Sequence, residues 1–406
     1  MTRKPKRDLT IEDQLSRGPV DLPFLMLVLL LVGFGLIMVF SASYASAYYD
    51  SSKHNNPLFY ITRQAVFAVL GLVVMWLVSR FNYEYLRALS FPLLVVSVVR
   101  LVLTLSPLGV TINRARRWLK MFIFFGPTYQ PSEIAKIALI LVFATCLCKR
   151  KPRRWKRLRG TRWEKCRECG HRLWISFKEL IPYGAMLGVV ALLVVKEPHM
   201  SGTILIIIGA AAVLFASGIS WGWFLSGGAA IAGALAFIIQ KTSYMTSRIE
   251  IWRDPWVDPL GKGFQNIQAL LAMGSGGLLG LGLGQSKQKF LYIPEPENDF
   301  IFSIVVEELG FIGAALLLFL FAMLILRGYW LALHARDKFG TLVIVGIVTL
   351  LAAQVFFNIA VVTKMVPNTG ISLPFFSYGG TALVMQLAEM GIILSISRQI
   401  PASRRD

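Results

Sequence analysis

Charged residues are scarce in this chain, and their scarcity excludes an ordinary soluble protein. Only 16% of the 406 residues are Asp, Glu, Lys or Arg, whereas 55% are hydrophobic. A soluble protein of this length would need far more charge to cover its surface. The class that remains is an integral membrane protein.

Cysteines are also few. The chain has four: Cys146, Cys148, Cys166 and Cys169. None falls in a loop that the topology below places outside the cell, so no structural disulfide is implied. Cys166 and Cys169 have the spacing of half a zinc ribbon, but their only partners would be two cysteines at a predicted helix end. We expect unpaired cytoplasmic thiols and no metal site, with zinc as the alternative.

Long apolar runs are abundant. Segments able to span ~30 Å of hydrocarbon recur along the whole chain. They predict an all-α polytopic membrane protein of ten helices, near residues 22–40, 62–80, 84–105, 131–148, 180–196, 202–219, 222–240, 299–326, 340–363 and 373–397. Pro131 suits the first turn of the fourth helix, because a missing N–H is harmless there.

Lys and Arg in the loops predict the orientation. The tail 1–20 holds five of them, and residues 149–172 hold twelve against two acids, a net of +10. We therefore place the tail, the loop 149–178 and the C-terminal tail 399–406 in the cytoplasm, around one membrane domain, 21–398. The basic loop fits a topology signal or anionic lipid headgroups better than nucleic acid, so no nucleic-acid partner is expected.

The longest loop, 241–298, then faces outward. Long loops in compact proteins are usually functional or disordered, and the aromatic residues of this one argue against disorder. Residues 264–273 predict a short amphipathic helix at the membrane interface. Six glycines between 274 and 284 could offer backbone N–H groups to an anion, but close packing or a re-entrant turn explains them equally well.

Asp299 lies where this loop leads into the next predicted apolar helix. A carboxylate at that depth costs free energy and is a functional-site candidate. Ser303 and Glu307 follow at four-residue intervals on the same face. For Glu307 and Glu308 we favour a buried structural network.

Other polar residues lie near the predicted outer surface or within helices. Glu133 and Lys136 stand three residues apart, where they can neutralise each other. Glu197 and His199 end the fifth helix. For each of these, a buried structural network is an open alternative.

Cations also gather on this outer side, although the positive-inside rule would place Lys and Arg mainly in cytoplasmic loops. Bidentate arginine contacts to phosphate would explain them, and ion pairs with neighbouring acids are the alternative. The set is Arg114, Arg116, Arg117, Lys120, Arg248, Arg253, Lys262, Lys287 and Lys289.

Several spaced motifs together resemble the SEDS family (shape, elongation, division and sporulation), and within it FtsW and SpoVE more than the RodA branch. They are Gln130-Pro131-Ser132-Glu133-Ile134-Ala135-Lys136, Asp254-Pro255-Trp256 with Gln265 and Gln268, Pro294 to Phe302, Glu307 to Gly313, and Gly370 to Gly380. The chain departs from many relatives at Glu297-Asn298, where they have His-Thr, and at His199, where they have Asp. These departures affect the roles of the flanking residues, not that of Asp299.

The resemblance implies an enzyme of the bacterial cell (inner) membrane with an outward-facing active site. It would polymerise lipid II into β-1,4-linked peptidoglycan strands, with inversion and release of undecaprenyl pyrophosphate, in cell division or sporulation. Its expected partners are a class B penicillin-binding protein (a transpeptidase) and other divisome proteins.

The chemistry needs little from the protein. Pyrophosphate leaves readily, so a single base with cationic stabilisation suffices, whereas a glycosidase needs two carboxylates. We expect Asp299 to be that catalytic base and Arg117, Arg248 and Lys136 to hold the pyrophosphate. The other expected substrate-binding residues are Glu133, Glu197, His199, Gln265, Gln268 and Ser377. No tightly bound cofactor is expected, although Mg²⁺ or Mn²⁺ could bind with the pyrophosphate.

Two other functions stay open. A transporter that flips lipid II would also use ten helices with intramembrane charges, but the sequence shows no inverted repeat. A non-catalytic scaffold for a penicillin-binding protein would leave Asp299 without a role.

Overall fold

The computed structural model describes most of the chain. The described residues are 18–53, 55–112, 115–120, 128–150, 162–197, 199–219, 222–224, 226–229, 233, 243–261, 263–290 and 292–400. Their helices are α2 Leu22–Tyr48, α3 Phe59–Arg80, α4 Glu84–Leu105, α5 Pro131–Cys148, α6 Arg162–Lys196, α7 Met200–Ala216, α9 Ser243–Arg253, α10 Phe264–Gly276, α11 Ile301–His334, α12 Lys338–Val362 and α13 Gly380–Ser397. Short 3₁₀ turns form at Ser51–Lys53 (η1) and Pro255–Val257 (η2).

The polytopic helical fold is confirmed. Within the described residues, eight helices are long and apolar enough to cross a membrane, and α7 is a shorter apolar helix of 17 residues. These nine correspond to nine of the predicted spans. The predicted span 222–240 lies mostly outside the described residues. The predicted amphipathic helix 264–273 is α10.

Four predicted boundaries were wrong. Helix α2 ends at Tyr48, eight residues beyond the predicted end. Helix α6 begins at Arg162, so the second half of the predicted basic loop is helical. Helix α11 runs eight residues beyond the predicted end, to His334. The last helix begins only at Gly380, because Pro374 disfavours helix for the residue before it and Phe375 has φ of +65°.

A three-stranded antiparallel sheet, which the sequence did not predict, lies between α4 and α5. Its strands are β1 Gly109–Ile112, β2 Ala115–Lys120 and β3 Thr128–Tyr129, in the order β1-β2-β3. Leu119 of β2 pairs with both Gly109 and Tyr129. The sheet matters because it carries Arg117.

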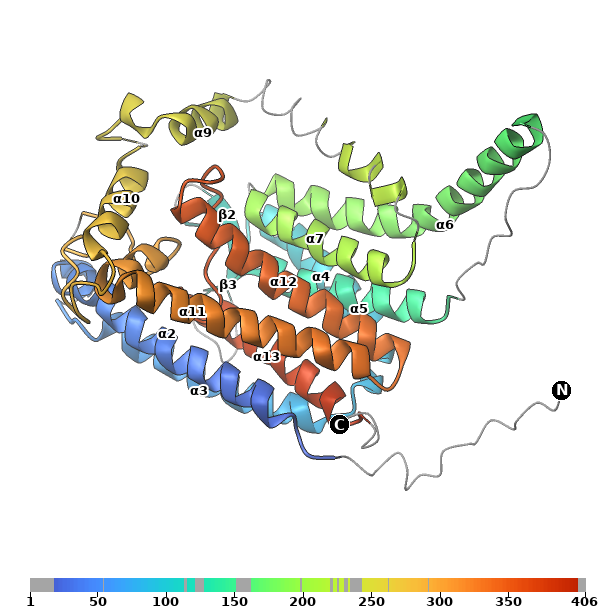
Figure 1. Ribbon diagram of the computed structural model, residues 1–406, viewed down its shortest axis with the longest axis horizontal. Helices are drawn as coiled ribbons and strands as arrows, with labels where there is room; N and C mark the ends of the chain where they lie inside the picture. Colours follow the sequence, from blue (N-terminus) through green and yellow to red (C-terminus); the bar gives the residue numbers. More distant parts are fainter. Residues whose placement is uncertain are drawn as a thin grey trace.

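The helices lie side by side in a bundle, with α5, α12 and α13 mostly buried (Figure 1). Helices α3, α4, α6 and α11 expose most of their surface, and that surface is apolar. Exposed residues on them include Val66, Val69, Leu89, Leu192, Leu316, Phe319 and Leu326. A contiguous apolar surface of this kind marks contact with a membrane.

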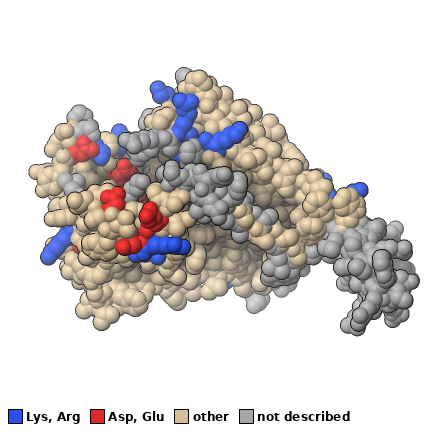
Figure 2. Space-filling model, turned by 90° about the horizontal axis from the view of Figure 1, so that it is seen from above, with Lys and Arg blue, Asp and Glu red and all other residues tan. Residues whose placement is uncertain are grey.

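Charged groups mark the two ends of the bundle. Helix α2 begins where α11 and α13 end, since Asp21 pairs with Arg327 at 2.6 Å and its N–H reaches the Ser397 hydroxyl. Cations cluster at this end, at Arg80, Arg87, Lys149, Arg150, Arg327, Arg336, Lys338 and Arg398. Helices α9 and α10 cover the other end, and Figure 2 shows acidic and basic side chains gathered mainly over that part of one face.

Helix α11 is kinked at Gly310, whose φ is +69° and ψ is −173°. The glycine segment after α10 packs against the kink. Backbone N–H groups of Leu281 and Gly282 donate to residues 307 and 308, and those of Phe311 and Ile312 donate back to residues 277 and 278. A Cβ on Gly280 would meet this backbone. Of the two interpretations of the glycines, the structure shows close packing.

Candidate functional site

Asp299 lies two residues before α11, outside the membrane-spanning helix and only partly exposed. Two elements distant in sequence hold it. Asn358 of α12 donates its amide to the Asp299 carbonyl at 2.9 Å and to the Ile371 carbonyl at 2.7 Å. Gly370 lies against the side chain, since a Cβ there would stand 3.0 Å from Asp299 Oδ2. The carboxylate therefore lies where the start of α11 meets the segment between α12 and α13.

The electrostatic surroundings of Asp299 are mixed. Burial is the largest influence and, with the Glu295 carboxylate, raises its pKa to about 6. The positive charges of Arg117 and Arg248 oppose this rise. An acid in this setting is mostly ionised at neutral pH yet basic enough to accept a proton.

The two arginines reach the site from separate elements, and each is fixed by a backbone carbonyl. Arg117 on β2 donates its Nε to the Glu197 carbonyl at 3.3 Å. Arg248 on α9 donates Nη1 to the Asn368 carbonyl at 2.7 Å. The structure thus brings together three residues that the sequence predicted, Asp299, Arg117 and Arg248.

Glu197 and His199 form a second polar group beside Arg117. Glu197 is fully buried, and burial raises its pKa to about 8. The Thr104 hydroxyl and the Arg117 charge lower the pKa, but by less than burial raises it. Burial and the charges of Arg117 and Lys136 lower the pKa of His199 to about 3. The His199 ring lies 3.1 Å from Gln130 Nε2. Both groups are therefore neutral at pH 7, suited to hydrogen bonding rather than to charge pairing.

Glu133 and Lys136 pair on the first turns of α5. Lys136 Nζ lies 2.8 Å from Glu133 Oε2, and the lysine side chain is only 3% exposed. This confirms the expected mutual neutralisation. The charge of Lys136 acts on His199, which places the pair next to the Glu197 group.

Two of the three remaining predicted residues, Ser377 and Gln265, bond to the backbone shortly before Asp299. Ser377 is buried, accepts from the Leu373 N–H at 2.7 Å and donates to the Asn298 carbonyl at 2.8 Å. Gln265 of α10 donates to the Pro294 carbonyl at 3.1 Å. Gln268 is half-buried on the same helix. The contacts of Ser377 and Gln265 are those of positioning residues.

Glu307 and Glu308 form the expected structural network. Glu307 accepts from the Ser286 hydroxyl and the Lys287 N–H. Glu308 pairs with Lys289 at 3.0 Å, with both side chains almost fully buried, and accepts from Ser41. Lys289 is therefore bound within the fold. Arg114 and Lys262 lie outside the described residues.

The described residues do not form a metal cage. Among them no group of three or more His, Cys, Asp or Glu side chains could hold a metal ion, and Cys146 and Cys148 are unpaired. The carboxylates of Asp299 and Glu295 are too few for a divalent cation, which would need most of its oxygen ligands from a bound phosphate. We assign no step to a metal.

Sequence reasoning missed Asn358, Gly370 and Glu295. Asn358 did carry a signal, because it is an amide within a 25-residue apolar helix, and polar groups at such positions are usually functional. Gly370 stands in one of the motifs that resemble the family, but its contact with Asp299 depends on the tertiary structure and could not be inferred from that motif.

Over most of its length the chain is similar to known proteins of one family. A family model described as cell cycle protein, covering FtsW, RodA and SpoVE, matches residues 22–401. The stage V sporulation protein E of Bacillus subtilis is 38% identical, over 93% of this chain and 97% of that protein. A probable peptidoglycan glycosyltransferase FtsW of Geobacter sulfurreducens is 37% identical, over 94% and 95%.

Two solved structures share the fold. One is a chain from a peptidoglycan synthase complex that coordinates polymerization and crosslinking, with a TM-score of 0.73 and 29% identity over 94% of this chain and 99% of that one. The other is the rod shape determining protein RodA of Thermus thermophilus, with a TM-score of 0.64 and 27% identity over 94% and 97%.

Proposed function

Because this chain belongs to the FtsW/RodA/SpoVE family of cell cycle proteins, we propose that it is a peptidoglycan glycosyltransferase that polymerises lipid II, with Asp299 as its base. The observation that carries the assignment is the position of Asp299. It is a partly buried carboxylate with a raised pKa, at the start of a membrane helix and in the field of two arginines from different elements.

The reaction follows from these groups. The Asp299 carboxylate accepts the proton of the acceptor sugar's 4-hydroxyl as its oxygen attacks the anomeric carbon of the donor. The bond from that carbon to the lipid-linked pyrophosphate breaks on the opposite face, so the configuration inverts. Arg117 and Arg248 offset the charge that develops on the pyrophosphate. His199, neutral and partly exposed, is placed to accept or donate a hydrogen bond to the sugars, whereas the fully buried Glu197 holds Arg117 through its carbonyl.

The membrane orientation is part of the proposal. Short cytoplasmic loops are rich in Lys and Arg, and the cations at the ends of α3, α5 and α13 fit that side. Asp299 lies at the opposite end, because Ser41 late in α2 contacts Glu308 early in α11. The site then faces the outer surface of the cell membrane, where lipid II carries its sugars. A penicillin-binding protein as partner is supported by the synthase complex that the fold resembles.

The test is polymerisation of purified lipid II by the full chain in detergent, alone and with a class B penicillin-binding protein. Asp299→Asn should abolish glycan product while the protein keeps its thermal stability. Glu250→Gln, which removes one exposed carboxylate from α9, is the matched control and should polymerise normally. Full activity of Asp299→Asn would refute the base assignment. Lipid II crossing vesicle membranes without polymerisation by the unmodified chain would replace the enzyme with a transporter.

A further inference from the structure

Glu297 is a buried carboxylate that the proposed reaction does not use. It lies two residues before Asp299, in the segment that leads into α11, and its side chain is only 1% exposed. Its neighbours differ, since Glu295 is exposed and Asn298 is partly exposed. Burial raises the pKa of Glu297, so the carboxylate needs specific polar partners at this position.

Helices α2 and α3 supply these partners. The Ser46 hydroxyl, in the last turn of α2, donates to Glu297 Oε2 at 3.3 Å. The Tyr60 hydroxyl, in the first turn of α3, donates a second hydrogen bond to the carboxylate and itself accepts from the Lys53 ammonium. The Glu297 side chain thus joins the segment before α11 to the facing ends of two helices.

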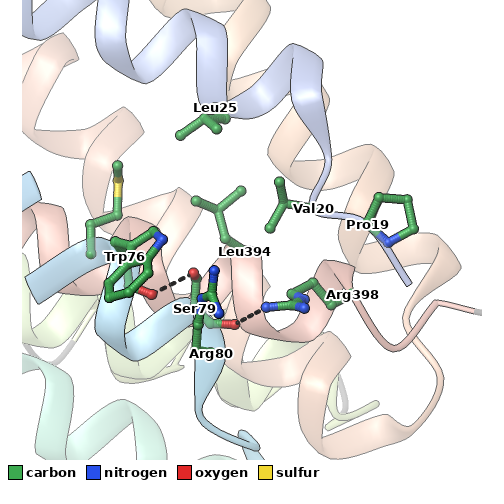
Figure 3. A pocket seen from close by; sticks show the side chains of 9 residues that line it. Pro19, Val20, Leu25, Trp76, Ser79, Arg80, Leu394 and Arg398 are labelled. Atoms are coloured by element: carbon green, nitrogen blue, oxygen red, sulfur yellow. Dashed lines mark hydrogen bonds between the residues drawn. The ribbon is translucent and has the colours of Figure 1, made fainter. Parts of the chain in front are cut away.

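Helix α3 is a firm support for this link, because it packs closely against α13. A Cβ added to Gly71 in the middle of α3 would clash with the Leu387 side chain of α13. At the other end of α3, Arg398 donates Nη1 to the Ser79 carbonyl at 3.5 Å, beside an apolar cavity of about 300 Å³ (Figure 3). The first turn of α3 is therefore the end of an anchored helix rather than part of a loop.

The backbone around Glu297 is bound at the same place. The Tyr378 N–H donates to the Glu297 carbonyl at 2.8 Å, and the rings of Tyr378 and Tyr60 meet edge to face with centroids 4.7 Å apart. Gln64 of α3 donates to the Ser377 carbonyl at 3.3 Å. The segments before α11 and before α13 therefore meet at the start of α3, and Glu297 bonds to both the helix and the second segment.

We propose that Glu297 is a positioning residue, which fixes the base Asp299 relative to α2 and α3 through Ser46 and Tyr60. Because its side chain is buried, it acts through Asp299 rather than on the substrate. Catalytic groups must be held within about 0.5 Å of their productive geometry, and a displacement of about 1 Å can cost on the order of a hundredfold in rate. The proposal rests on the proposed function, since it takes Asp299 as the base.

The test measures the turnover number and the KM for lipid II, with the full chain in detergent. Glu297→Ala removes the link and should lower the turnover number at least about tenfold, while KM changes less than about twofold, because the base moves and the substrate contacts stay. Glu297→Gln keeps an acceptor for Tyr60, so its turnover number should return to within about twofold of that of the unmodified chain.

Tyr60→Phe tests the link from its other side. It deletes the hydroxyl between Lys53 and Glu297 and should lower the turnover number in the same way. The double variant Glu297→Ala with Tyr60→Phe should be no slower than the slower single variant, because both changes break one link. Tyr44→Phe removes the hydroxyl of an exposed tyrosine on α2, and as the matched control it should polymerise normally.

Three results would overturn the proposal. They are a turnover number of Glu297→Ala within about twofold of the unmodified chain, an equal loss in Glu297→Gln, and losses that multiply in the double variant. A rise in KM alone would make Glu297 a substrate contact and also overturn it. Asp299→Asn separates the two levels: if that variant polymerises, the proposed function has failed, whereas if it is inactive and Glu297→Ala is normal, only the positioning role has failed.

Discussion

Acid should switch off polymerisation over a pH range set by Asp299. Burial and the Glu295 carboxylate raise its pKa to about 6, and only the ionised form can accept a proton. At pH 5 about one molecule in eleven would carry the ionised form, so the rate should be about tenfold below that at pH 8. An aspartate with its ordinary pKa of 3.8 would instead keep about nine-tenths of the rate at pH 5.

Two substitutions should move the acid limb of this profile in opposite directions. Arg248→Gln removes a positive charge that lowers the pKa of Asp299, so the limb should move to higher pH. Glu295→Gln removes a negative charge that raises it, so the limb should move to lower pH. Gln at 295 can still accept the hydrogen bond from Asn298, which makes it a conservative change. The maximal rate of Arg248→Gln should also fall, because a phosphate contact is lost.

The assay is the initial rate of lipid II polymerisation between about pH 4.5 and pH 8.5, with circular dichroism at each pH. Unfolding linked to Asp299 does not explain a loss at low pH. The pKa of Asp299 is higher in the folded state than in the unfolded state, so ionising this carboxylate destabilises the fold. The destabilisation is complete above about pH 6 and absent below about pH 4, so acid relieves it. A rate at pH 5 within twofold of that at pH 8, or shifts of both variants in one direction, would refute the reasoning.

Three further substitutions test the residues around Asp299 and the buried network. Asn358→Ala removes the donor from two carbonyls, which should cost about 1–3 kcal/mol for each and lower both the melting temperature and the turnover number. Gly370→Ala adds a methyl group 3.0 Å from Asp299 Oδ2 at φ of +69°, a strain of about 1 kcal/mol, so polymerisation should fall more than thermal stability does. Glu308→Ala leaves the Lys289 ammonium buried without its carboxylate and should destabilise the fold by about 3–5 kcal/mol, seen in thermal melts in detergent.

A matched control for the glycine substitution lies in α2. Gly33 has nothing within 4 Å of an added Cβ and has no positive φ, so Gly33→Ala should leave activity and melting temperature unchanged. If Gly370→Ala behaves like Gly33→Ala, its contact with Asp299 is unimportant. A normal turnover number for Asn358→Ala would show that Asp299 keeps its position without the two hydrogen bonds. Unaltered stability of Glu308→Ala would show that Lys289 finds another partner.

The sequence predicted features that depend on local spacing. Apolar runs placed nine of the described helices, because a membrane helix is defined by its length and composition. The three-residue spacing of Glu133 and Lys136 was enough to predict the ion pair that they form. The acids at 307 and 308 were correctly taken as structural, although the loop residues that bind them could not be named.

Features set by tertiary contacts could not be predicted in this way. Asn358 holds Asp299 across 59 residues of sequence, and the strand that carries Arg117 has no apolar alternation long enough to recognise. Besides Pro374, the hydrogen bonds of Ser377 to Leu373 and Asn298 hold residues 373–379 out of a helix, and these bonds could not be inferred from the sequence. The sequence indicated the chemistry of the site, whereas its geometry required the fold.

The junction between the glycine segment and the bend at Gly310 has a mechanical consequence. Four main-chain hydrogen bonds join residues 277–282 to residues 307–312, so no side-chain replacement removes them directly. A force applied to α10 would therefore be transmitted to α11 at residues 307–312 through these four hydrogen bonds.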